Sequence, residues 1–176
     1  MTNDRAGHPP KAGPAIEFSN GTQPTDARMA PDTADVITVR MPSRLELLNV
    51  LDHVAQSVCQ RLEFDDSTMS QVTMSVIEAG TNAIQHGHRR DASKPVDAQF
   101  HVFEDRLEVV VHDSGPGFDL SRIGGDITTP EHLFDVRGRG IFIMRACMDS
   151  VNFEFGPDGT RCRLVKRRPA SPANGA

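Results

Sequence analysis

The spacing of apolar residues changes along the chain and predicts where strands and helices lie. Residues 36–42 (VITVRMP) read as a first strand that stops at a proline, which has no amide hydrogen to donate. Apolar residues then recur every three or four positions from Leu47 to Leu62, and this spacing predicts a long amphipathic helix. The pair Ser43 and Glu46 has the spacing of a capping box at the start of that helix.

The remaining pattern predicts two further helices and two hairpins. A second helix is expected from residue 65 to about Gly87, and the alternation in 96–103 and 107–113 predicts a hairpin. An irregular glycine-rich stretch follows, then a helix opening near 138–140 and a closing hairpin around GPDG. Because strands and helices cluster rather than alternate, we expect an α+β two-layer sandwich with helices on one face of a largely antiparallel sheet.

Both ends of the chain differ in composition from the middle. Residues 1–34 hold five prolines and few bulky apolar residues, so we expect a disordered tail, although the short IEF at 16–18 could dock on a partner. Residues 169–176 predict a second tail. A single folded domain is therefore expected over residues 35–168.

Composition excludes several functional classes. The net charge of -5 makes nucleic acid an unexpected main partner. The three cysteines form no C-x-x-C pair, which argues against a disulfide framework or zinc site and predicts a reducing cytoplasm. The N-terminal residues lack a signal-peptide pattern, and no apolar run is long enough to cross a membrane.

Three polar residues are spaced four apart on the second predicted helix. Glu78, Asn82 and His86 fall on one slowly rotating stripe beside its apolar face. The amide oxygen of Asn82 suits a hard cation such as Mg²⁺, and Glu78 suits a general base or the binding of a metal-bound water. A solvated polar face is the alternative for such a stripe taken alone.

Three further segments contain residues that could bind parts of a nucleotide. Asp113 ends a buried strand and opens DSGPG, where an ionised carboxylate could accept a hydrogen bond from an exocyclic amine such as that of adenine. Residues 137–140 (RGRG) open a helix whose N-terminus could bind phosphate. The alternatives are a plain turn and an ordinary glycine loop, and residues 158–160 (DGT) taken alone are a hairpin turn.

The order of these segments resembles the GHKL superfamily of ATP-binding domains. The matching pieces are EAGTNAIQH (78–86), DSGPG (113–117), GRG (138–140) and GT (159–160), and the resemblance covers about residues 35–167. It implies the Bergerat fold, with a mixed, mostly antiparallel sheet, and it implies ATP and Mg²⁺ as cofactors.

Within that superfamily the chain looks most like the RsbW-type serine-protein kinases. Because the segment before residue 78 is short, we expect no dimerisation helices of the kind that sensor histidine kinases carry. The resemblance implies an ATP-dependent serine/threonine-protein kinase and anti-sigma factor of a bacterial partner-switching system, with a sigma factor and an anti-anti-sigma (STAS-type) protein as partners and a homodimer as the assembly. The alternatives are a non-catalytic ATP-binding regulatory module and a slow ATPase without a protein substrate.

The resemblance also implies roles for individual residues. It makes Glu78 the general base for the substrate hydroxyl, Asn82 the Mg²⁺ ligand and Asp113 the partner of the adenine amine. Residues 119–137 would form a lid over ATP, from whose end one of two arginines would reach the γ-phosphate. Further residues implied near the nucleotide are His86, Gly115, Gly117, Arg137, Gly138, Arg139, Gly140 and Thr160.

Overall fold

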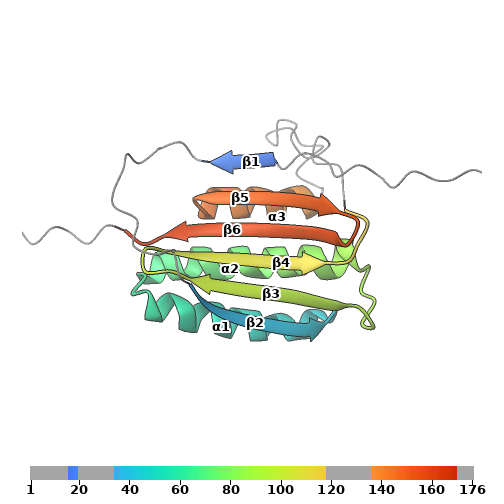
Figure 1. Cartoon of the computed structure of the whole chain (residues 1–176), viewed down its shortest axis with the longest axis horizontal. Coiled ribbons are helices and arrows are strands. Elements are labelled where there is room, and N and C mark those ends of the chain that lie inside the picture. The colour runs from blue at the N-terminus through green and yellow to red at the C-terminus, as the bar shows by residue number, and fades with distance from the viewer. Residues whose placement is uncertain (1–15, 20–33, 118–135, 170–176) are drawn as a thin grey trace, which may run out of the picture.

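The computed structural model describes residues 16–19, 34–117 and 136–169, which form one sheet covered by helices on one face (Figure 1). The strands are β1 (Ile16–Ser19), β2 (Asp35–Pro42), β3 (Pro95–Val102), β4 (Arg106–Asp113), β5 (Ser150–Gly156) and β6 (Gly159–Arg167). The helices are η1 (Leu45–Leu47), α1 (Leu48–Arg61), α2 (Asp66–Asn82), η2 (Ala83–Gly87) and α3 (Val136–Cys147).

The strand order is β1-β5-β6-β4-β3-β2. The α+β sandwich predicted from the sequence is confirmed, and the expected helices and hairpins occur within a few residues of their predicted bounds. One detail is wrong: every strand pair among the described residues is antiparallel, whereas the resemblance implied a mixed sheet.

Strand β1 lies inside the segment that was expected to be a disordered tail. Residues 16–19 pair with β5, with Ile16 opposite Phe153 and Ser19 opposite Ser150. Without this pairing β5 would be the edge of the sheet, with a row of unsatisfied backbone groups. The local sequence did not predict this strand. It forms by pairing with β5, which lies more than a hundred residues away in sequence. Residues 1–15, 20–33 and 170–176 lie outside the described residues, so disorder of these parts of the tails stays a prediction.

The core forms between the helices and alternate strand residues. In β4 the residues facing the helices are Leu107, Val109, Val111 and Asp113, so the last core-facing position is a carboxylate rather than an apolar side chain. Helices α1 and α2 approach closely at Gly80, where an added Cβ would lie 2.6 Å from Leu48 Cδ2. Helix α2 lies over the middle of the sheet (Figure 1), and the candidate site described below lies at its C-terminal end.

The predicted capping box at Ser43 is wrong. Helix η1 begins after Arg44 and has no side-chain cap. The Ser43 hydroxyl instead donates to Lys94 O at 2.9 Å and lies 2.6 Å from His88 Nδ1. A serine beside a helix start can bond to partners other than the helix, and here those partners lie 45 and 51 residues later in the sequence.

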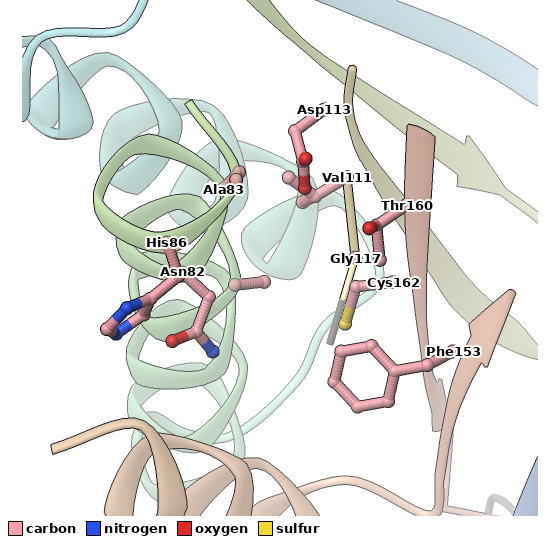
Figure 2. A pocket seen from close by; sticks show the side chains of 11 residues that line it. Asn82, Ala83, His86, Val111, Asp113, Gly117, Phe153, Thr160 and Cys162 are labelled. Atoms are coloured by element: carbon pink, nitrogen blue, oxygen red, sulfur yellow. The ribbon is translucent and has the colours of Figure 1, made fainter. Parts of the chain in front are cut away.

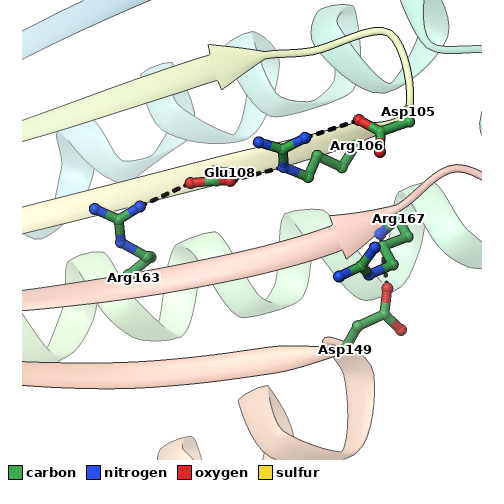
Figure 3. Close-up of polar contacts among 6 residues, drawn as sticks. All are labelled: Asp105, Arg106, Glu108, Asp149, Arg163 and Arg167. Carbon is green, nitrogen blue, oxygen red and sulfur yellow. Dashed lines mark hydrogen bonds and ion pairs between the residues drawn. The ribbon is translucent and has the colours of Figure 1, made fainter. Parts of the chain in front are cut away.

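The open face of the sheet is polar and carries the ion pairs drawn in Figure 3. Glu108 accepts from Arg106 Nε and from Arg163 Nη1, both at 2.8 Å. At the same end of the sheet, Arg167 N donates to Asp149 at 2.6 Å. Such partly exposed pairs each contribute about 0–1 kcal/mol, so they mark a solvated surface more than they stabilise the fold.

Among the described residues, no helix has both the length and the apolar character that crossing a membrane requires.

Candidate nucleotide site

The C-terminal end of α2 carries one wall of the site. The helix widens there into the single π-turn η2, closed by a bond from His88 N to Ala83 O of 2.9 Å. Such wide turns inside α-helices often occur at functional sites. Asn82 is the last residue before the turn and His86 lies within it. Asn82 Nδ2 is buried and makes no hydrogen bond within the described part of the chain, so this polar atom is available to a ligand.

Strands β4 and β6 carry the opposite wall. Their register places Asp113 directly across from Thr160. Both side chains are buried, with exposed fractions of 7% and 4%. Asp113 Oδ1 accepts from Gly115 N at 2.8 Å, which fixes the carboxylate at the start of the loop that follows β4. An ionised carboxyl group has two oxygens that accept hydrogen bonds, so Asp113 can also accept from a ligand at this position.

A pocket lies between the two walls (Figure 2). Its empty volume is about 350 Å³, a figure that includes open solvent at its mouth. Figure 2 shows Asn82 and His86 on the helix and Asp113, Thr160, Cys162 and Phe153 on the strands facing it. The complete lining is Ala79, Asn82, Ala83, His86, Gly87, Val111, Asp113, Gly117, Phe153, Thr160 and Cys162.

The deeper wall of the pocket is apolar. Val111, Cys162 and Phe153 follow one another across β4, β6 and β5, because Val111 pairs with Cys162 and Cys162 with Phe153. Burial, followed by the nearby charge of Asp113, raises the pKa of the Cys162 thiol. The thiol is therefore neutral and acts as a small apolar group, not as a nucleophile. A flat apolar wall with one carboxylate at its edge suits a heteroaromatic base.

Two glycines allow the loop after β4 to lie against its neighbours. Gly117 has a φ of +74°, and an added Cβ would lie 2.8 Å from the Phe155 ring. At Gly115 an added Cβ would lie 2.3 Å from the carbonyl oxygen of Gly87. The loop therefore packs backbone against backbone on the π-turn, which fixes the mouth of the pocket.

We expect Gly115→Ala to disrupt this contact. Because the new methyl group meets backbone that cannot move aside, the free energy of unfolding should fall by about 2 kcal/mol. Gly156→Ala is the matched control, since its Cβ would meet only the exposed side chain of Asp158. Chemical denaturation of the two variants measures the difference. Equal stability of the two would contradict the packing of this loop.

Glu78 lies one helical turn before Asn82 and outside the pocket lining. A Cβ added to Gly140, on α3, would lie 2.6 Å from Glu78 Oε2 and 3.7 Å from Asn82 Nδ2. The start of α3 therefore lies against the polar stripe of α2, and a larger residue at position 140 would require the Glu78 carboxylate to shift. This arrangement places a carboxylate next to the end of the pocket that Asn82 lines.

The structure thus brings most of the predicted site residues together. Asn82, His86, Asp113, Gly117 and Thr160 line one pocket, with Gly115 beside it and with Glu78 against Gly140. On α3, Gly138 is buried and Arg139 is exposed. The Arg137 side chain and residues 119–135 of the predicted lid lie outside the described part.

Sequence reasoning missed the apolar wall. Val111, Phe153 and Cys162 read as ordinary core positions, because alternation gives the face of a residue but not its neighbours on other strands. Only the register of β4 on β6 reveals that these residues continue the face that carries Asp113. His88 was also missed, and its contacts come from segments far apart in sequence.

Comparison with known proteins agrees with this geometry. Residues 41–166 match the family described as histidine kinase-like ATPase domain. The chain belongs to that family. This ATPase domain is similar to "Serine-protein kinase RsbW" of Bacillus subtilis (strain 168), with 33% identity over 70% of this chain and 80% of the relative. The proteins of that name from Bacillus velezensis and Oceanobacillus iheyensis are 32% and 30% identical, over 69% of this chain and 79% and 82% of their own.

The residues of the ATPase domain fit an adenine nucleotide with Mg²⁺. Asn82 Nδ2 has no hydrogen-bond partner among the described residues, and the oxygen and nitrogen of an amide exchange places by a simple flip, so the oxygen can face a cation. Within the described residues, no three His, Cys, Asp or Glu side chains are grouped closely enough to hold a metal ion. Nucleotide-bound Mg²⁺ needs no such group, because it keeps its waters and phosphate oxygens as most of its ligands.

Proposed function

We propose that this ATPase domain is a protein-serine/threonine kinase that phosphorylates a small protein partner. The observation that carries the proposal is the placement of Glu78 one helical turn from Asn82, beside a pocket edged by Asp113 and Thr160. A domain that only bound ATP would not need a carboxylate at the phosphate end. The relatives named serine-protein kinase support the same activity.

The pocket residues bind and orient the base. One oxygen of Asp113 is held by Gly115 N, and the carboxylate accepts from the exocyclic amine of adenine. Thr160, directly across from it, contributes a hydroxyl at the same edge. Phe153 and Cys162 exclude water from the face of the base. These contacts select adenine over guanine, which presents a carbonyl where adenine presents its amine.

The α2 stripe acts at the phosphate end. Asn82 would hold Mg²⁺ through its amide oxygen, and His86 would pack beside the phosphates from the π-turn. Bound Mg²⁺–ATP supplies the transferable phosphoryl group and neutralises its charge. Glu78 orients the partner's hydroxyl and accepts its proton on a carboxylate oxygen. Gly138, Gly140 and an arginine, 137 or 139, would present the start of α3 to the phosphates.

The partners are proposed from the resemblance and the relatives. A sigma factor and an anti-anti-sigma protein of STAS type would compete for the domain, and phosphorylation of the second would decide the outcome. A homodimer and a cytoplasmic location belong to the same proposal. The alternative is a regulatory module that binds ATP and a partner without catalysis.

Incubation with γ-labelled ATP, Mg²⁺ and a recombinant STAS-type partner tests the proposal. We expect label on one serine or threonine of the partner, located by mass spectrometry, and none when that residue is alanine. Stable ATP binding without label on the partner would favour the regulatory module. Free phosphate without phosphoprotein would indicate an ATPase.

A further inference from the structure

One buried histidine connects three segments around the pocket. His88 follows the π-turn and has an exposed fraction of 2%. Its Nδ1 lies 2.6 Å from Ser43 Oγ, between β2 and η1. Its Nε2 accepts from Ser114 N at 2.8 Å and lies 3.0 Å from Ser114 Oγ. Ser114 immediately follows Asp113, so the imidazole ring joins the start of the helical layer to the adenine-binding loop.

The hydrogen bonds fix the tautomer of the ring. A backbone N–H can only donate, so Nε2 must carry a lone pair. Nδ1 therefore carries the hydrogen and donates to Ser43 Oγ, which in turn donates to Lys94 O. Both ring nitrogens of His88 then have partners in a consistent direction. Only the neutral, Nδ1-protonated imidazole satisfies this arrangement.

The same junction is closely packed on its other side. A Cβ at Gly87 would lie 2.2 Å from Asp113 Oδ1, and a Cβ at Gly115 would lie 2.3 Å from Gly87 O. Residues 87–88 thus contact Asp113, Ser114 and Gly115 together. A shift of the imidazole ring would move the loop that carries the carboxylate, and with it the adenine contact.

We propose that His88 is a positioning residue, which as a neutral imidazole holds the Asp113–Gly117 loop in its nucleotide-binding geometry and releases it when protonated. This inference rests on the proposed function for its effect on nucleotide binding. Protonation would place a hydrogen on Nε2, facing the N–H of Ser114, and the bond between them would be lost. Affinity for adenine nucleotides should therefore fall as the pH decreases.

The surroundings of the ring favour the neutral form. Burial lowers the pKa of His88 from its ordinary value of 6.5. Asp113 opposes this shift, and Lys94 adds to it; Asp91 raises the pKa and His112 lowers it by smaller amounts. The ring is therefore neutral at neutral pH. The loss of binding should begin below the ordinary value and continue as the pH falls through the lowered pKa.

Titration of the full-length protein with a fluorescent ADP analogue in the presence of Mg²⁺, from about pH 8 to about pH 5, tests the proposal. His88→Leu removes both hydrogen bonds, and we expect its affinity at neutral pH to fall about tenfold. His88→Gln keeps an acceptor that can reach Ser114 N and cannot become charged. It should bind within about twofold of wild type at neutral pH and lose less affinity at low pH.

The control is His53→Gln, because His53 is an exposed histidine on α1. It should follow the wild-type pH profile, which also contains the titration of the nucleotide itself. A His88→Gln profile that coincides with wild type would overturn the proposal, as would unchanged affinity in His88→Leu.

A second measurement remains decisive if His88→Leu does not fold. Nitrogen-15 NMR of the wild-type protein should show His88 protonated on Nδ1 and not on Nε2 at neutral pH. An Nε2-protonated or charged ring would refute the inference. If wild-type protein bound no adenine nucleotide, the proposed function would fail, and the NMR result would still decide whether Nε2 of His88 can accept from Ser114 N.

Discussion

Replacing Glu78 with glutamine should abolish phosphorylation of the partner protein and leave nucleotide binding nearly unchanged. The substitution keeps the size of the side chain and its fit against Gly140, where the carboxylate oxygen approaches the glycine closely. It removes the group that can accept a proton from the incoming hydroxyl. General-base catalysis contributes about 10²–10⁴-fold to enzymatic rates, so the rate of transfer should fall on the order of 1,000-fold.

The binding constant separates this role from a structural one. Because Glu78 lies outside the pocket lining, the dissociation constant for ADP should change by less than about threefold, equivalent to one weak hydrogen bond. Glu46→Gln is the matched control, since Glu46 is an exposed residue of η1. A Glu78→Gln protein that phosphorylates its partner at the wild-type rate would remove Glu78 from the mechanism.

Replacing Asp113 with asparagine should have the largest effect on nucleotide binding. Asparagine can still accept from Gly115 N through its oxygen, so the loop should keep its shape. Its NH₂ group then faces the adenine amine, and two donors oppose each other. Losing a charged hydrogen bond and leaving a buried donor unpaired should weaken ATP binding on the order of 100-fold.

The same substitution should change the preference between bases. Guanine presents a carbonyl acceptor at the position of the adenine amine, which the new NH₂ group can satisfy. The ratio of ATP to GTP affinity should therefore fall sharply in Asp113→Asn and stay unchanged in Asp97→Asn, whose side chain pairs with Arg40 at 3.5 Å. Equal ATP affinity in wild type and Asp113→Asn, measured by calorimetry, would refute the adenine contact.

Much of the fold was predictable because the local patterns are strong. The alternation in β3 and β4 and the helical spacing in α1 and α2 each bury one face. The polar stripe of α2 was predictable for the same reason, since a spacing of four residues places Glu78 and Asn82 on one side of a helix.

The rest depends on contacts between distant segments. The pairing of Asp113 with Thr160 joins strands separated by α3 and β5, and no local pattern specifies that register. The capping-box prediction at Ser43 failed because His88, 45 residues later, takes its hydroxyl. The strand β1 likewise follows from tertiary pairing and not from propensity.

A crystal structure of the protein with Mg²⁺ and a non-hydrolysable ATP analogue tests the central claim most directly. The account predicts the adenine amine within about 3 Å of an Asp113 carboxylate oxygen, and Mg²⁺ bound at about 2.1 Å by the Asn82 amide oxygen. A nucleotide bound elsewhere, or a base in this pocket whose amine faces away from Asp113, would contradict it.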